Sequence, residues 1–475
     1  MMHAFIPEEG PMVAVGGRGN NEVEAFKARF AGIALTAGDD GYDEARALWN
    51  GWFDKRPALV ARCRTTQDVV SVVRFARASG LPLAVRSGGH SLAGLSSCDD
   101  GIMLDLSLMR DVVVDAPERI ARVQPGATWA GFDAATQVHG LATTGGLISH
   151  TGVAGLTLGG GIGWLMRRYG LAADNLTAAE VVTASGDILR TSGTEEPELL
   201  WGLRGGGGNF GVVTSFEFRL HPLGPVLGGL MGFPLDRGRE VLQRYRTWAA
   251  EVGDGFTTLA AVITAPPAPF VPPELVGQKI VGLAGCWCGE VDAGEAALAP
   301  LRELQPAFDV FGPMPYASLQ RMLDEGAPPG IRSYTRSGYA ADLSDGLIDV
   351  ALEHGASMPS PFSQLHLHHM GGAVARVGED DTAFGNRRAT YAYNVNSMWT
   401  DPSADELNET MNRGFAAALT PLSTGGVYVN FLGNEGDARI RAAYGDTKYE
   451  RLRRLKRRSD PENLFRLNQN IPPAS

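Results

Sequence analysis

Apolar residues recur at helical spacing and at alternating spacing, in turn, along the first part of the chain. Residues 65–79 carry apolar side chains three and four positions apart, which predicts a helix that begins at Thr65 or Thr66 and ends at Gly80. Short apolar runs predict buried strands at 58–63 and 81–87. A strand–helix–strand order is typical of a crossover unit that joins parallel strands.

The pattern continues with further elements as far as residue 222. We predict helices at 43–52 and 130–140, and a third helix that begins at Pro197. The predicted strands lie at 101–109, 119–129, 178–185 and 187–192, with a long one that ends near Leu220.

After residue 222 the glycines thin out and helices alternate with strands. A helix predicted at 239–252 precedes strands at 278–288, 362–377 and 389–399. This order indicates an antiparallel sheet backed by helices, so the fold class is α+β. A strand at 425–433 and a helix within 449–465 form a final unit, which we expect to return to the first domain.

We therefore divide the chain into four parts. An N-terminal segment, 1–40, carries few patterns, and we expect part of it to be mobile. The other parts are a first domain at 41–222, a second domain at 223–422 and a C-terminal segment at 423–475.

Composition and charge exclude several classes of protein. Among 475 residues, 44% are hydrophobic and 20% charged, which excludes wholesale disorder. A net charge of −11 argues against nucleic-acid and anionic-membrane partners, and the basic run 451–458 is interpreted as one solvated helix face. The N-terminus lacks the features of a signal peptide, so we expect a soluble, cytoplasmic protein. Cys286 and Cys288 fit alternate positions of a buried strand better than a metal site.

Glycine is the compositional exception, with 61 residues gathered partly into three clusters at 87–94, 145–163 and 205–211. None of the clusters meets the requirements of a Rossmann fingerprint, and no GK[ST] motif occurs. Bare backbone N–H groups can hold a pyrophosphate, so a large phosphate-bearing cofactor is one interpretation. Glycines that serve only tight turns are the other.

Six motifs then resemble the berberine bridge enzyme-like flavoproteins of the vanillyl-alcohol oxidase superfamily, over residues 49–473. They are RSGGHSLAG, VQPGATW, GLISHTGVAGLTLGGGIGW, LLWGLRGGGGNFGVV, YVNF and SDPENLFRLNQNIPP. The resemblance implies a PCMH-type FAD-binding domain built from 41–222 and 423–475, with a substrate domain between the two parts.

The resemblance also implies specific cofactor residues. It assigns His90 to a covalent bond with the flavin 8α-methyl group, and it assigns the pyrophosphate to the loop around it. Ile148 stands where many relatives carry a second, cysteinyl link, so we expect FAD to be attached through His90 alone. Thr151 holds the position that screens the oxygen-reactive flavin carbon. The residues predicted to bind FAD are Arg86, Ser87, Gly88, Gly89, His90, Ser91, Gly126, Gly146, Leu147, His150, Thr151, Gly152, Gly155, Gly159, Gly160, Gly163, Asn175, Val213, Tyr428, Asn430 and Asn468.

Two of these predictions have a plain alternative. His150 faces the flavin or is a loop histidine satisfied by backbone. Asn468, like Asn470, reaches the cofactor or caps a helix end.

Candidate catalytic residues lie in the tail and in two strands. Alternation places Tyr428 and Asn430 on one strand face, and Tyr428 is the first candidate for the base. Phe431 replaces the last tyrosine of the family motif, so no role transfers to it. The rival bases are Tyr391, Tyr393, His366 and His368. A solvent-exposed sheet face is the alternative for these strands, and a metal site at the histidines, including His369, lacks a carboxylate.

These residues predict an FAD-dependent oxidoreductase. We expect an oxidase that removes a hydride from a C–H bond of a small organic substrate, such as an alcohol, sugar, amine or secondary metabolite, with dioxygen as electron acceptor. A reductase with a nicotinamide donor and a flavin-binding protein without turnover are the alternatives. We expect a monomer or homodimer and no metal.

Overall fold

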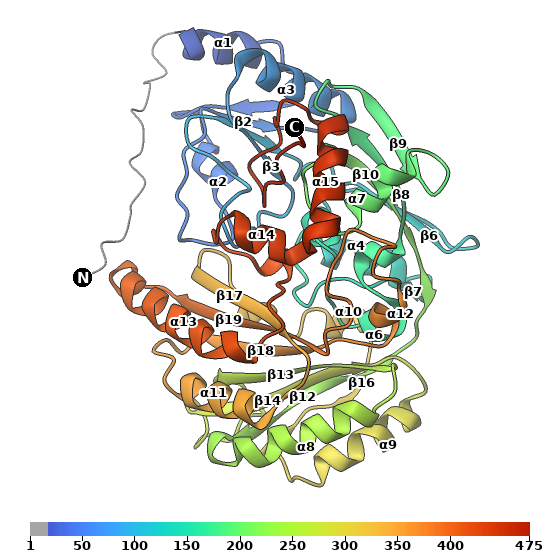
Figure 1. Ribbon diagram of the computed structural model, residues 1–475, viewed down its shortest axis with the longest axis vertical. Coiled ribbons are helices and arrows are strands. Elements are labelled where there is room, and N and C mark those ends of the chain that lie inside the picture. The colour runs from blue at the N-terminus through green and yellow to red at the C-terminus, as the bar shows by residue number, and fades with distance from the viewer. Residues whose placement is uncertain (1–17) are drawn as a thin grey trace.

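The computed structural model describes residues 18–475 and contains three main sheets, with the third below the other two in Figure 1. Residues 18–40 contain helix α1 (Arg18–Lys27) and strand β1 (Ile33–Leu35). The remainder of the segment 1–40, predicted to be mobile in part, lies outside the described residues.

The first sheet has the strand order β1-β2-β4-β3, and its last three strands are parallel. Helix α3 (Thr66–Ser79) connects β2 to β3 as predicted. Thr65 and Asp68 form a capping box at its start, and Gly80 ends it with φ 70°. The strands are β2 (Leu59–Arg62), β3 (Leu83–Arg86) and β4 (Ile102–Asp105).

The helix predicted at 43–52 is shorter, because α2 covers only Tyr42–Arg46. The residues after it form a loop that joins two parts of the molecule. The Trp49 amide donates to the Gly89 carbonyl at 3.1 Å, and the Asn50 amide group donates to the carbonyls of Leu92 and Ser333. These long-range bonds compete with helical ones.

The second sheet is antiparallel, with the order β5-β6-β10-β8-β9. Helix α4 packs on it through Trp129 and Phe132, which meet Phe218 edge to face. The strands are β5 (Val112–Asp115), β6 (Ile120–Val123), β8 (Leu176–Val182), β9 (Ile188–Ser192) and β10 (Val212–Arg219). The helices of this part are α4 (Trp129–Gln137), α5 (Val153–Leu158), α6 (Met166–Tyr169) and α7 (Pro197–Leu203), and β7 (Leu141–Ala142) pairs with β11 (His221–Pro222).

The third sheet is antiparallel, with the order β15-β12-β14-β13-β18-β19-β17, and β16 pairs with β12. Figure 1 shows helices α8, α9, α11 and α13 on its outer side. The strands are β12 (Val226–Pro234), β13 (Phe256–Thr264), β14 (Lys279–Trp287), β15 (Phe308–Asp309), β16 (Gly312–Met314), β17 (Arg332–Ala340), β18 (Gln364–His369) and β19 (Tyr391–Trp399). The helices are α8 (Gly238–Glu251), α9 (Val291–Arg302), α10 (Tyr316–Leu319), α11 (Asp345–Ala356), α12 (Ala373–Arg376) and α13 (Asp405–Leu419). The predicted antiparallel sheet backed by helices is therefore present.

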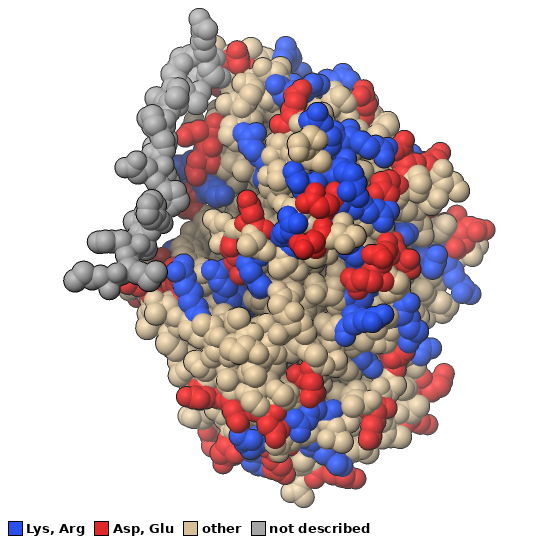
Figure 2. Space-filling view, viewed as in Figure 1, with Lys and Arg blue, Asp and Glu red and all other residues tan. Residues whose placement is uncertain are grey.

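The C-terminal segment returns to the N-terminal half, where Figure 1 shows α15 beside α7. Its helices are α14 (Asp437–Tyr444) and α15 (Asp446–Ser459). Within α15 the buried Lys456 ammonium donates to Asp460 and to the carbonyls of Asn209 and Phe465. Basic and acidic side chains are interspersed over α15 in Figure 2, and Arg451 pairs with Glu198.

The prediction of a strand at 425–433 is wrong. This stretch is irregular and contains one 3-10 turn, Val429–Phe431. The hydrogen bonds of Tyr428 and Asn430 go to residues of α5 and the loop after it instead of to a neighbouring strand.

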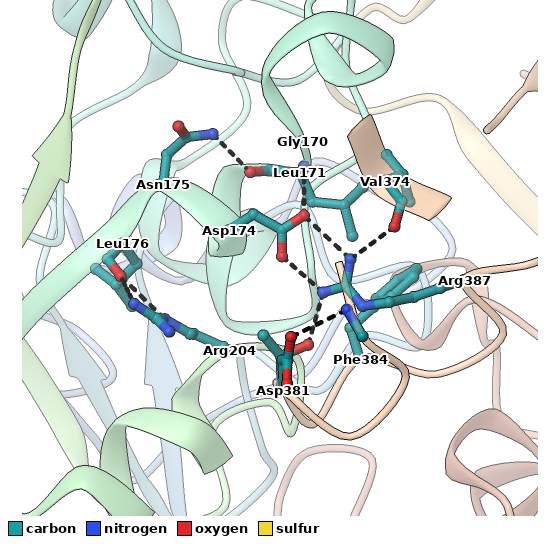
Figure 3. Close-up of polar contacts among 12 residues, drawn as sticks. Gly170, Leu171, Asp174, Asn175, Leu176, Arg204, Val374, Asp381, Phe384 and Arg387 are labelled. Carbon is teal, nitrogen blue, oxygen red and sulfur yellow. Dashed lines mark hydrogen bonds and ion pairs between the residues drawn. The ribbon is translucent and has the colours of Figure 1, made fainter. Parts of the chain in front are cut away.

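A loop of the second domain is held under the first by a buried ion pair, drawn in Figure 3. Two Arg387 nitrogens bond to the Asp174 carboxylate at 2.6 and 3.1 Å, and Arg387 also donates to Thr382 and to the Val374 carbonyl. The two charged side chains are 1% and 7% exposed. Such a bidentate pair fixes the loop against the 3-10 turn Ala172–Asn175. No helix within 18–475 has the length and hydropathy that a membrane span requires.

Candidate active site

A cavity of about 1060 Å³ lies between the loops of the first two sheets and the inner face of the third. It exceeds the roughly 300–1,000 Å³ of a site for one small ligand, so it has room for a cofactor and a substrate. Its lining includes the loop after β3, the loop before α5, the loop before β10, the tail, and strands β13, β14, β18 and β19.

Glycines bring two of these loops into contact. A Cβ on Gly152 would lie 2.5 Å from the Gly88 nitrogen, and a Cβ on Gly88 would strike the Gly152 backbone. Gly89 has φ 72°, a conformation that favours glycine. A Cβ on Gly155 would meet no atom within 4 Å and would project into the cavity. The glycines therefore allow close packing of the loops and leave open space in front of them.

His90 lies in the loop after β3 and lines the cavity. Its ring stacks on Trp49 at 5.1 Å, and its Nε2 lies 2.8 Å from Nδ1 of His150. Burial, with a smaller effect of His150, lowers the pKa of His90 to about 3, so the imidazole is neutral near pH 7. Because Nε2 is engaged by His150, Nδ1 is the ring nitrogen that has no hydrogen-bond partner among residues 18–475.

His150 does not line the cavity; it lies behind His90. Neither alternative from the sequence describes it, because its partner is another histidine. Its Nε2 is buried without a hydrogen-bond partner. Ile148 and Thr151, on either side of it, both line the cavity.

Tyr428 is buried, and its hydroxyl oxygen accepts three N–H groups. The Gly161 amide lies at 2.9 Å, the Ile162 amide at 3.3 Å and the Asn430 side-chain amide at 2.8 Å. Burial raises the pKa of Tyr428, and these donors oppose the rise. Both Tyr428 and Asn430 line the cavity, although no strand holds them.

Strands β18 and β19 present a polar face to the cavity. His366 lies directly opposite Asn394, and its Nε2 is 2.6 Å from the Gln364 side-chain oxygen. His368 Nε2 is 2.9 Å from the Asn394 side-chain oxygen. Since an amide oxygen only accepts, both histidines carry their proton on Nε2 and leave Nδ1 as an acceptor. Burial lowers the pKa of His366 to about 3 and that of His368 to about 4.

The prediction that Tyr391 and Tyr393 face the substrate is wrong. Tyr393 is paired with Leu367, so it lies on the sheet face opposite His366, and both tyrosines pack in the core against the outer helices. Burial raises the pKa of Tyr391. The residues of β19 that face the cavity are Asn394, Asn396 and Met398.

Several predicted cofactor residues also lie away from the cavity. Arg86 donates to the Ala45 carbonyl, and the Asn175 side chain is occupied by His221 and by two carbonyls. The glycines among them serve packing: a Cβ on Gly159 would strike Asn430, and one on Gly160 would strike Phe384. The predicted residues outside the lining are Arg86, Gly126, His150, Gly159, Gly160, Gly163, Asn175, Tyr391 and Tyr393.

The other predicted residues do meet at the cavity. They are Ser87, Gly88, Gly89, His90, Ser91, Gly146, Leu147, Thr151, Gly152, Gly155, Val213, His366, His368, Tyr428, Asn430 and Asn468. Asn468 caps no helix; its amide donates to the carbonyls of Gly208 and Phe465, and its side-chain oxygen is buried without a partner.

Sequence reasoning missed Trp49, Asn394 and Asn396, and it missed the apolar lining from β13 and β14. The signal for Asn394 and Asn396 was present, since the same alternation that predicts Tyr391 and Tyr393 on one face places them on the other.

Comparison with known proteins agrees with this arrangement. Residues 57–192 match the family model of an FAD binding domain, and residues 427–472 match the model described as berberine and berberine like. An uncharacterised FAD-linked oxidoreductase of Bacillus subtilis is 30% identical over 94% of this chain and 98% of its own. The (R)-6-hydroxynicotine oxidase of Paenarthrobacter nicotinovorans is also 30% identical, over 93% of this chain and 97% of its own.

Solved structures show the same fold. The crystal structure of 6-hydroxy-D-nicotine oxidase from Arthrobacter nicotinovorans has a TM-score of 0.83 at 28% identity and covers 94% of this chain and 98% of its own. A xylooligosaccharide oxidase from Myceliophthora thermophila in complex with xylobiose has a TM-score of 0.83 at 23% identity. The match covers 97% of this chain and 100% of that oxidase.

Proposed function

Because the chain belongs to the berberine bridge enzyme-like family of FAD-linked oxidoreductases, we propose that it oxidises a small organic molecule at a C–H bond and passes the electrons to dioxygen. Bound FAD would supply the hydride acceptor, and the protein would position the substrate and take its proton. The observation that carries the proposal is one continuous cavity, with His90 in its cofactor part and Tyr428 and the histidine strand in its substrate part.

The residues around His90 suit FAD. Among the residues that the structure describes, no lysine or arginine lines the cavity, so the pyrophosphate would be held by backbone N–H groups of residues 87–91. The open space in front of Gly155 and the unpartnered oxygen of Asn468 give the cofactor room and a hydrogen-bond acceptor. Residues 41–222 and 423–475 would form the FAD-binding domain, and residues 223–422 the substrate domain.

The covalent bond would join Nδ1 of His90 to the flavin 8α carbon in place of one C–H bond of the methyl group. The Nε2 proton of His90 would pass to His150, and the two electrons released would pass to dioxygen, the acceptor proposed above. A nucleophile needs a free lone pair, which Nδ1 has when His90 donates its Nε2 proton to His150. The low pKa keeps the ring neutral. Ile148 has no nucleophilic atom, so this would be the single link.

Tyr428 would be the residue that accepts the substrate proton. A phenolate needs donors that stabilise its charge, and the amides of Gly161 and Ile162 already point at the oxygen. His366 and His368 would orient the substrate through their free Nδ1 atoms. Thr151, with a valine-sized side chain, would leave room for dioxygen.

An oxygen-electrode assay of the holoenzyme with alcohols, sugars and amines tests the proposal. Oxygen uptake that depends on one of these compounds is the expected result. If NADH or NADPH reduces the flavin and none of the alcohols, sugars or amines does, the protein is a reductase. If nothing reduces the flavin, it binds FAD without turnover, and the proposal is wrong.

A further inference from the structure

The inner face of the third sheet has two chemically different halves. Strands β18 and β19 contribute Gln364, His366, His368 and two asparagines, as described above. Strands β12, β14 and β13 lie beside them and contribute Leu230, Gly282, Ala284, Leu259, Ala261 and Ile263. Apart from Thr264 of β13, the polar side chains of this wall therefore lie at its β18–β19 end.

Strand pairing places the smallest of these residues in a row that leads away from His366. Ala261 lies directly opposite His366, Gly282 opposite Ala261, and Gly232 opposite Gly282. Residues paired in this way share one face of the sheet. Neighbouring strands are about 4.8 Å apart, so the row runs roughly 14 Å from His366 to Gly232.

The row is a trench because its floor lacks side chains. A Cβ on Gly282 would have only Ile263 nearby, at 3.6 Å, so the space above it is open. At Gly232 the trench ends, because the Phe308 ring lies where a Cβ would stand. One side is formed by the neighbouring row Leu230, Ala284, Leu259, which ends at His368.

The rim of the cavity is apolar as well. Phe270, Val276 and Phe362 all line it and are 40%, 38% and 39% exposed. Large hydrophobic side chains gathered at an open cavity mark a binding site for an apolar ligand. Among residues 18–475, Glu325 is the one charged side chain in the lining, so an anionic substrate would have no counter-ion.

We propose that the substrate is uncharged and amphiphilic, with a polar group held at His366 and an extended apolar body in the trench over Ala261 and Gly282. Oligosaccharides are disfavoured, because the trench offers few hydrogen-bond partners for buried hydroxyl groups. The inference rests on the proposed function in placing the reacting group beside the flavin. It makes Ala261 and Gly282 the residues whose small size admits a long substrate, up to the end of the trench at Phe308.

Binding of dead-end ligands tests the trench without turnover. The probes are primary carboxamides from butanamide to octanamide, which have no hydroxyl to oxidise, titrated calorimetrically into the holoenzyme. Burial of a methylene is worth about 0.8 kcal/mol, so the Kd should fall roughly threefold to fourfold for each one added. Hexanoate should bind at least tenfold more weakly than hexanamide, and xylobiose more weakly than octanamide.

Filling the trench should shorten the accepted chain. In Gly282→Leu, octanamide should lose at least tenfold in affinity while butanamide stays within twofold. Gly224→Leu, at an exposed glycine outside the cavity, should change neither the octanamide affinity nor the butanamide affinity. If the leucine variant does not fold, Gly282→Ala and Gly282→Val should show the same trend in smaller steps.

The results that would overturn the inference are distinct from failure of the oxidase proposal. A Kd that does not change with chain length, an unchanged octanamide affinity in the Gly282 variants, or tighter binding of xylobiose than of octanamide would each contradict it. Carboxamide binding with the expected trend in a protein whose flavin nothing reduces would leave the trench established and remove the oxidase.

Discussion

Asp133 should make the stability of the protein depend on pH between about 4 and 7. This residue of α4 is buried, and one carboxyl oxygen accepts from Gln320 at 2.9 Å while the other has no partner. Burial raises the pKa of Asp133 from 3.8 to about 7, and the Gln320 hydrogen bond opposes the rise only partly. The folded protein therefore holds this proton more tightly than the unfolded chain does.

The sign and size of the effect follow from linkage. Below pH 4 both states are protonated and there is no penalty; as the pH rises to 7, the folded state loses stability. At 1.36 kcal/mol per pKa unit the loss reaches about 4 kcal/mol. Asp133→Asn keeps the shape and cannot ionise, so it should match wild type at pH 4 and be more stable at pH 8.

Thermal unfolding of both proteins across this pH range is the assay. At about 2–4 °C per kcal/mol for a unit of 150–250 residues, the variant should melt roughly 8–16 °C higher than wild type at pH 8. Asp236→Asn, at an exposed site, is the control and should show no pH-dependent difference. A melting difference between Asp133→Asn and wild type that is the same at pH 4.5 and pH 8 would refute the reasoning.

Three further predictions concern the site and its frame. Tyr428→Phe should slow anaerobic flavin reduction by more than tenfold. In wild type the rate should still be rising at about pH 10, because burial raises the pKa of Tyr428 above that of an ordinary phenol, whereas a neutral histidine base would give a flat profile above about pH 5. Arg387→Met should destabilise the protein by about 3–5 kcal/mol, because the buried Asp174 carboxylate loses its partner, and the added change Asp174→Asn should restore most of the loss in urea unfolding. Gly152→Val should prevent FAD retention on gel filtration, because its Cβ would displace the Gly88 loop. Gly193→Val, at an exposed glycine where a Cβ would meet no atom within 4 Å, should retain the cofactor.

Local patterns in the sequence predicted most of the fold. Helix α3 carries its capping residues and its terminal glycine within its own sequence, so both ends could be predicted. The error in predicting a strand at 425–433 could not be seen from the sequence. The alternation there is genuine, but the hydrogen bonds of Tyr428 and Asn430 join them to residues more than 260 positions away. Long-range contacts of this kind have no local signal.

The site shows the same limit. Alternation separated Tyr391 and Tyr393 from Asn394, but it did not tell which face meets the cavity, since both faces of β19 are buried. Likewise Gly159, Gly160 and Gly163 stand in a glycine-rich motif, yet their small size serves contacts with Asn430, Phe384 and Gly145. The trench depends on pairing across four strands, which the sequence alone does not reveal.

The covalent attachment of FAD through His90 is tested most directly by mass spectrometry of a tryptic digest. Trypsin should release His90 in the peptide 87–110 and the second glycine cluster in the peptide 123–167. We predict one FAD-bearing peptide, 87–110, with the flavin on His90, and none in His90→Ala. Flavin that separates completely from the denatured chain, or a flavin adduct on peptide 123–167, would contradict the account.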